Sequence, residues 1–260
     1  MMSIQPEDME DLKTAKWLLE NPGIAAKIID FLGAPIQKGF ELLPKSWNAT
    51  IGAATRTVLF ISVNAAVFTM DNKPRKESSN LWHKIAVAAT GGVGGFFGLP
   101  ALVLELPIST TVMLRSIADI ARSEGEHIHS SESKMACIEV FALGGLSKGD
   151  DGSGTGYFAV RAALAKTVTK AVEYIAEKGI AEESAPALIR LIIQVADRFS
   201  IQVSEKVAAQ ALPAIGSVGG AVINSLFIDH FQNMAHGHFV VRRLERKYGI
   251  SAVKNAYGSI

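Results

Sequence analysis

Residues 85–104 read IAVAATGGVGGFFGLPALVL, twenty consecutive residues without a charged side chain, among them five glycines and one proline. A second uncharged stretch, residues 207–228, reads VAAQALPAIGSVGGAVINSLFI. A helix needs about 20 apolar residues to cross the hydrocarbon core of a bilayer, so both stretches are long enough. Both are also rich in small residues, which let helix backbones approach closely. Two interpretations remain open: the stretches span a membrane, or they pack together in a core that inserts at most peripherally.

Glycines recur at a spacing of four residues within both stretches. Each glycine in a helix interior costs about 1 kcal/mol, so keeping several requires compensation, most simply from a second helix lying in the groove. We therefore predict two glycine-rich helical segments packed together. The candidate contacts for lipid or for a partner helix are Gly91, Gly95, Gly98, Gly216 and Gly220, with Gly94 paired to Gly98 in the same way.

Basic residues flank each stretch on both sides, so the asymmetry of lysine and arginine that orients membrane spans is missing. This favours a packed or peripherally inserted helix pair over true spans. The flanking residues are Lys73, Arg75, Lys76, Lys84, Arg115 and Arg122 for the first stretch, and Lys206, Arg242, Arg243, Arg246 and Lys247 for the second.

The composition narrows the class of protein. The 260 residues include 26 basic and 25 acidic side chains, a balance that offers no field to recruit nucleic acid, so no nucleic-acid partner is expected. The lone cysteine, Cys137, fits a reducing compartment. The first residues, MMSIQPEDMEDLK, lack the apolar core of a signal peptide. We expect a cytoplasmic protein, peripherally associated with the inner membrane.

Apolar residues recur with helical periodicity along the chain, and convincing β alternation is missing. We predict one all-α domain over residues 1–260, with N-terminal helices in residues 1–45, a core in residues 46–260 and a flexible loop at residues 144–156. The individual helices are expected at residues 6–20, 46–70, 108–123, 134–143, 157–178, 184–210 and 238–248, with a broken pair of short helices in residues 23–43 and a further helix from the second glycine-rich stretch to about residue 234.

Three acidic residues, Glu105, Glu139 and Glu205, lie within apolar segments. A buried carboxylate is costly unless it is paired, so each needs a partner. The expected partners are Arg115, Arg122, Arg161 and Arg198. Such pairs can fix the register between helices, or they can form an acid–base or headgroup-binding centre around Glu105 and Arg115. Both interpretations remain open.

The motifs of common enzyme classes are missing. The chain lacks H-E-x-x-H, the G-x-S-x-G elbow and the phosphate-binding glycine loops, so we expect no metal and no cofactor. The weak candidates for metal ligands are Asp229, His230, His236 and His238, which share neighbouring faces of one helix. His127 and His129 belong to a polar loop and are expected to be solvated.

Residues 238–249, HFVVRRLERKYG, carry a basic turn after an apolar one. Arg242, Arg243 and Lys247 are candidates for contact with anionic lipid headgroups, as in helices that lie in a membrane interface. The alternative is a solvated helix C-terminus, where cations are favoured by the helix dipole.

Several segments together resemble the EcsC protein family, and they cover nearly the whole chain. They are NPGIAAKIIDFLGAPI, GGVGGFFGLPALVLELPISTTVMLRSIADIA, GEHI, ACIEVFALGG, SEKVAAQALPAIGSVGGAVINSLFIDHF and AHGHFVVRRLERKYG. The founding member of the family is bacterial and is encoded beside an ABC transporter without being part of it, so the resemblance implies a bacterial protein; it assigns no reaction. Matching positions include Glu105, Thr110, Arg115, Cys137, Glu139, Gly144, Asn224, His238 and Arg243.

The leading hypothesis is a membrane-associated helical protein that reversibly binds lipid or a membrane protein. The alternative is a membrane-linked hydrolase, peptidase-like or lipase-like, with Glu105, Arg115, Glu139 and His238 as candidate catalytic residues. A third interpretation is a homo-oligomer assembled through the glycine faces.

Overall fold

The structure, a computed structural model, describes residues 4–20, 23–33, 36–68, 99–144, 156–178, 186–212 and 216–260. Every regular element in these ranges is a helix, so the all-α prediction is confirmed. The helices are α1 (Pro6–Glu20), α2 (Ile24–Leu32), α3 (Gln37–Glu41), α4 (Trp47–Phe68), α6 (Leu99–Ser123), α7 (Ser131–Glu139), the 3-10 helix η1 (Val140–Ala142), α8 (Gly156–Lys178), α9 (Pro186–Gln210), α10 (Gly216–Tyr248) and α11 (Ile250–Ser259).

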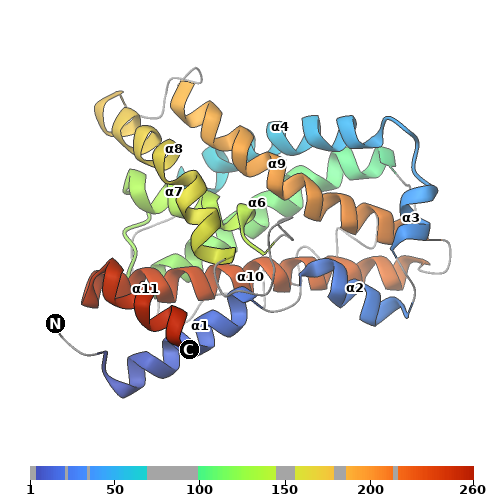
Figure 1. The fold of residues 1–260 in the computed structure, drawn as a ribbon. Helices are drawn as coiled ribbons and strands as arrows, with labels where there is room; N and C mark the ends of the chain where they lie inside the picture. The colour runs from blue at the N-terminus through green and yellow to red at the C-terminus, as the bar shows by residue number, and fades with distance from the viewer. Residues whose placement is uncertain are drawn as a thin grey trace.

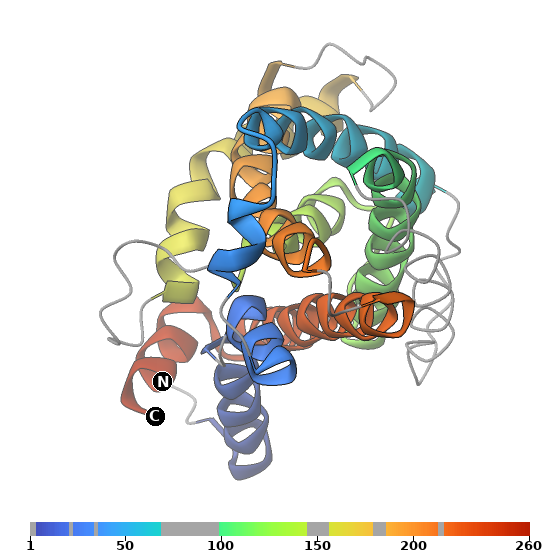
Figure 2. The same ribbon diagram turned by 90° about the vertical axis from the view of Figure 1, so that its right-hand side faces the viewer.

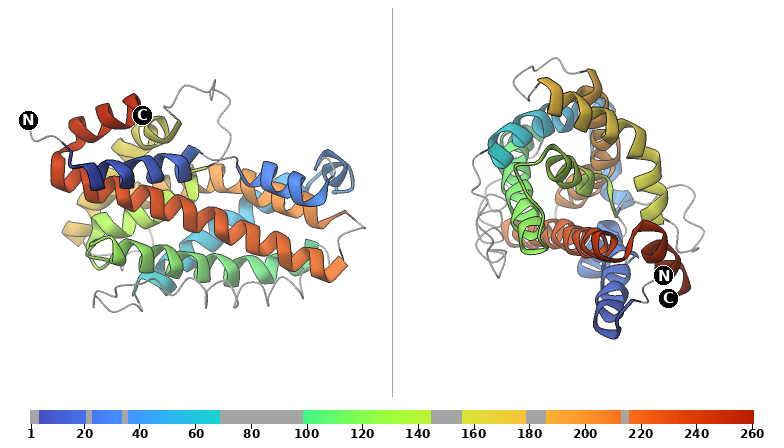
Figure 3. Two further views of the ribbon diagram at one scale, coloured as in Figure 1. Left: turned by 90° about the horizontal axis from the view of Figure 1, so that it is seen from below. Right: turned by 90° about the vertical axis from the view of Figure 1, so that its left-hand side faces the viewer.

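The long helices α4, α6, α8, α9 and α10 form the body of the molecule (Figure 1). Helix α4 packs on α6 and α9, α6 packs on α10, and α8 packs on α9. Seen along the long axis, these helices surround α7, which lies near the middle (Figure 2). Helix α1 runs along α10, and α11 folds back beside α1 at the same end of the molecule (Figure 3).

The central segment formed by α7 and η1 is almost entirely buried. Every residue from Ser133 to Leu143 is buried, polar ones included. The helix begins at a side-chain cap, because Ser130 Oγ accepts a hydrogen bond from the backbone N–H of Ser133 at 3.1 Å. Polar groups placed on such a segment must find partners inside the protein. The segment therefore carries one of the polar clusters described below.

The helix boundaries differ from the sequence expectations in several places; α7 and η1, for example, cover residues 131–142, where one helix over residues 134–143 was predicted. Helix α6 runs without a break from Leu99 through Pro107, whereas the sequence predicted a start at residue 108. Helix α10 is continuous through Gly237, where a break was predicted. This glycine serves close packing, since a Cβ there would lie 2.9 Å from the Ala15 carbonyl oxygen of α1. The short helix α11 was not predicted.

The two glycine-rich stretches are only partly covered. Residues 85–98, with Gly91, Gly95 and Gly98, lie outside the described residues, so the packing of the two stretches stays a prediction. Gly216 begins α10, Gly220 is buried, and α10 packs on α6. Among the described helices, none combines the length and the hydropathy that a bilayer crossing requires. Of the predicted loop at residues 144–156, only the two end residues are described.

Candidate functional site

Glu105 lies in a buried ion pair at the junction of three helices. Its Oε1 accepts hydrogen bonds from Lys206 Nζ of α9 at 2.7 Å and from Asn224 Nδ2 of α10 at 3.1 Å. The Lys206 side chain is 0% exposed and that of Glu105 is 5% exposed. The Lys206 ammonium also lies 5.0 Å from the centre of the Phe227 ring. Glu105 therefore has its partner, but this partner is a lysine and not one of the expected arginines.

Arg115 does not join this pair. It lies on the same helix as Glu105, ten residues further on, which corresponds to about 15 Å along the axis. Its side chain is exposed, whereas Glu105 is buried. The structure therefore does not bring the two residues together as an acid–base or headgroup-binding centre.

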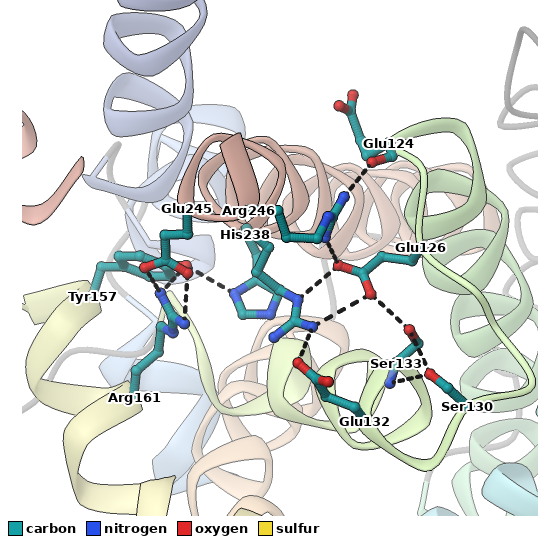
Figure 4. A network of polar contacts seen from close by, with 11 residues as sticks. Glu124, Glu126, Ser130, Glu132, Ser133, Tyr157, Arg161, His238, Glu245 and Arg246 are labelled. Carbon is teal, nitrogen blue, oxygen red and sulfur yellow. Dashed lines mark hydrogen bonds and ion pairs between the residues drawn. The ribbon is translucent and has the colours of Figure 1, made fainter. Parts of the chain in front are cut away.

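A second buried cluster joins α8 to α10 (Figure 4). The Tyr157 hydroxyl lies 2.9 Å from His238 Nδ1 and accepts a hydrogen bond from Arg161 Nη1 at 3.3 Å. Arg161 also donates two hydrogen bonds to Glu245, at 2.7 and 3.0 Å. Burial, together with the nearby Arg161 and Arg242, holds the pKa of His238 well below its usual value of 6.5. His238 is therefore a neutral imidazole at physiological pH.

Glu139, at the end of α7, belongs to the same neighbourhood. Burial raises the pKa of Glu139 to about 7, against the opposing effects of Arg161 and Arg242. A carboxyl group that titrates near neutrality can exchange protons, whereas the lowered pKa of His238 makes its imidazole a poor proton acceptor at neutral pH. Both side chains are shielded from solvent, with His238 0% and Glu139 6% exposed. Two of the four candidate catalytic residues, Glu139 and His238, thus share the electrostatic surroundings of Arg161 and Arg242, in a setting that suits an internal polar network.

Arg242 is part of the interior side of α10. Its Nε donates to Glu126 at 2.9 Å and its Nη2 donates to Glu132 at 3.0 Å. Glu126 also accepts a hydrogen bond from Ser133 Oγ at 2.6 Å and is paired with Arg246 (Figure 4). Although burial alone would raise the pKa of Glu126, these contacts lower it below its ordinary value. Arg242 therefore ties α7 and the turn before it to α10.

Arg243 and Lys247 lie on the outer side of α10, against α1. Arg243 pairs with Asp11 at 2.6 Å and with Glu124 at 3.1 Å. Lys247 pairs with Asp8 at 2.7 Å, and this carboxylate also accepts a hydrogen bond from the Tyr248 hydroxyl at 2.5 Å. The side chains of Arg243 and Lys247 remain 38% and 53% exposed. Of the three candidate headgroup contacts, Arg242 is thus enclosed, while Arg243 and Lys247 are accessible and face acidic partners.

The weak candidates for metal ligands do not converge. His230 and His238 are buried at different positions along α10, while Asp229 and His236 are half-buried. The ring of His230 packs against Gly144, where a Cβ would lie 2.5 Å from His230 Cε1. Burial lowers the pKa of His230 to about 3, so this ring is neutral as well. Across the described ranges, no three His, Cys, Asp or Glu side chains gather closely enough to hold a metal ion.

Comparison with known proteins identifies the family. A model described as the EcsC protein family matches residues 12–244. This chain belongs to the EcsC protein family. The resemblance seen in the sequence is confirmed. The matched residues include Glu105, Lys206 and His238, whereas the last residues of α10 and the whole of α11 lie beyond the matched region. Searches of curated proteins and of solved structures return no match for this EcsC-family chain.

Proposed function

We propose that this EcsC-family protein binds anionic membrane surfaces peripherally and reversibly. The contact is assigned to the corner formed by the end of α10, by α11 and by α1, referred to below as the α10–α11 corner. The observation that carries the proposal is the coincidence of accessible cations with exposed apolar side chains at this corner. The cytoplasmic leaflet of a bacterial inner membrane is an anionic surface of the required kind.

The cations of the corner lie next to the most exposed large apolar residue that the described ranges contain. The side chains of Arg243, Arg246 and Lys247 are 38%, 44% and 53% exposed. Ile250 follows Lys247 by three residues and is 64% exposed. Cations that meet headgroups and an apolar side chain that enters the acyl boundary are the two components of interfacial binding.

Helix α1 extends the same corner. Lys16 Nζ donates a hydrogen bond to the Tyr257 carbonyl at 3.0 Å, which joins α1 to α11. The adjacent Trp17 is 62% exposed, and Ile260 at the end of α11 is 43% exposed. Tryptophan is enriched at membrane–water interfaces because its ring is apolar and its N–H is polar. Trp17 thus supplies a second anchor of suitable chemistry.

The hydrolase interpretation has less support. Glu105 is engaged by Lys206, Arg115 lies about 15 Å away along α6, and His238 is fully enclosed. A hydrolytic centre would require these groups to converge on a site that a substrate can enter. The observed pairing instead links helices to one another.

The test is co-sedimentation of the full chain with vesicles. The protein is expected to bind phosphatidylcholine vesicles that contain phosphatidylserine and to bind only weakly to vesicles without it. Binding should also weaken as salt is added, because salt screens the electrostatic attraction. A juxtamembrane cation contributes about 1 kcal/mol, so Arg243→Gln with Lys247→Gln should lower the partition coefficient by up to about 30-fold.

A matched pair of apolar variants tests the second component. Ile250→Ser is expected to weaken binding to the vesicles. The control is Leu42→Ser, which should leave binding unchanged: Leu42 is similarly exposed, at 56%, but it directly follows α3 and lies outside the α10–α11 corner. Absence of binding to anionic vesicles at low salt would reject the proposed function. Equal losses in both serine variants would reject the assignment to the α10–α11 corner.

A further inference from the structure

We infer that α1 restrains this membrane-binding corner, because the carboxylates of Asp8 and Asp11 occupy the cations that would otherwise meet lipid phosphates. The inference rests on the proposed function and assigns a regulation to the same surface. An anionic bilayer then has to compete with an internal acidic helix before Lys247 and Arg243 are available.

The charges of the two elements are complementary. Helix α1 carries five acidic and two basic side chains, whereas residues 242–254 carry five basic side chains and one acidic side chain. Asp8 meets Lys247 and Asp11 meets Arg243, so α1 runs antiparallel to α10. Asp8 and Asp11 are three residues apart on α1, so they lie on one face of that helix. Their partners Lys247 and Arg243 are four residues apart and likewise share one face of α10. The acidic helix thus covers the basic turn with matching register.

These ion pairs are of a kind that exchanges readily. Lys247, Arg243 and Asp11 are substantially exposed, although Asp8 is only 15% exposed, and ion pairs that solvent reaches contribute little net stability because water and salt compete for them. Phosphate oxygens accept the same charge-assisted hydrogen bonds as carboxylate oxygens, in the same paired geometry for arginine. A dense layer of headgroup phosphates can therefore replace Asp8 and Asp11.

The exchange does not require α1 to leave α10. Leu12 and Ala15 are fully buried in the same core as α10, and Gly237 allows the backbone of α1 to come close. Lys247 and Arg243 would thus exchange carboxylate partners for phosphate partners while α1 stays packed on α10. Arg242 does not take part, since it is 13% exposed and is held by Glu126, which is itself buried.

Two charge-matched double variants test the inference. Asp8→Asn with Asp11→Asn removes the two carboxylates of α1 that pair with Lys247 and Arg243, and leaves the pair of Arg243 with Glu124 in place. Glu7→Gln with Glu10→Gln removes the same number of charges from α1, but these residues are exposed, and Glu10 pairs with Lys13 of the same helix at 2.6 Å. In co-sedimentation with phosphatidylserine vesicles at low salt, the asparagine variant should bind about tenfold more tightly than the wild type. The glutamine variant should differ from the wild type by less than about threefold, since it changes only the general field.

The outcomes separate the inference from the proposed function. Tighter binding of the asparagine variant alone, over measurable binding of the wild type, supports the inference. Binding of the asparagine variant without measurable binding of the wild type rejects the proposed function and, with it, the inference that a bilayer can displace the two carboxylates. Binding of the wild type with equal gains in both variants, or with no gain in either, overturns the inference and leaves the function standing. Absence of binding in the wild type and in both variants overturns both. Circular dichroism melting curves check that all three proteins are folded to the same extent.

Discussion

Replacement of Lys206 by methionine is expected to lower the free energy of unfolding by about 3–5 kcal/mol, the range found when one partner of a buried ion pair is removed. The cause is the carboxylate of Glu105, which is 5% exposed and loses its ammonium partner at 2.7 Å. The hydrogen bond from Asn224, at 3.1 Å, remains but carries no full charge. Methionine keeps most of the side-chain volume, so the loss reports the uncompensated charge and not a cavity.

A double-mutant cycle measures this coupling. Glu105→Gln alone should also cost about 3–5 kcal/mol, because it leaves the buried ammonium unpaired. The double variant Glu105→Gln with Lys206→Met carries no charge at the site, and the glutamine oxygen can still accept from Asn224. It should therefore recover at least about 2 kcal/mol relative to the sum of the single losses.

Urea denaturation followed by circular dichroism gives the four free energies. If the two single losses add in the double variant within about 0.5 kcal/mol, the charges are independent and the proposed basis of the α6–α9–α10 junction is refuted. A loss below about 1 kcal/mol for Lys206→Met would likewise show that the carboxylate finds water or another partner.

Three further predictions concern the interior. Burial raises the pKa of Glu139 to about 7 in the folded protein, above its usual value of 4.5, so the free energy of unfolding falls as pH rises between these values. Glu139→Gln should leave this free energy unchanged at pH 4 and raise it by up to about 3 kcal/mol at pH 8, measured by urea titration at both pH values. Tyr157→Phe removes the hydroxyl 2.9 Å from His238 and should cost about 1–3 kcal/mol in the same assay, and a neutral result would refute the contact. Gly39→Ala places a Cβ 1.8 Å from the Ala208 carbonyl oxygen, so α3 must move away from α9 and the midpoint of thermal unfolding should drop. The control is Gly52→Ala, whose Cβ would lie in open space and should not lower the midpoint.

The sequence predicted most helices because apolar periodicity is a local property. The bounds of α1 agree at both ends, and α8 and α9 agree within about two residues. The breaks were predicted less well: helices were expected to break before residue 108 and between residues 234 and 238. Gly237 and Pro107 instead lie inside α10 and α6, and in the case of Gly237 the reason is the close approach of α1. Such an approach depends on a helix more than 200 positions away in the chain.

Sequence reasoning also identified the residues that needed partners better than it identified the partners. The sequence marked Glu105 and Glu139 as carboxyl groups in apolar segments, and both are buried. It named Lys206 as a basic flank of the second uncharged stretch but did not consider it as the partner of Glu105. Tyr157 gave no signal of its own, because its role depends on His238 lying opposite on another helix.

The amino-acid sequence by itself determined the helical class, the membership in the EcsC family and the rule that each buried carboxyl group must be compensated. These follow from periodicity, from motifs and from the cost of burying charge, none of which requires knowledge of distant contacts. Only the tertiary structure decided that Glu105 meets Lys206 and that the basic end of α10 faces the acidic helix α1. The reason is physical: ion pairs form within about 4 Å, and which side chains come that close depends on how helices pack, which local sequence patterns do not specify.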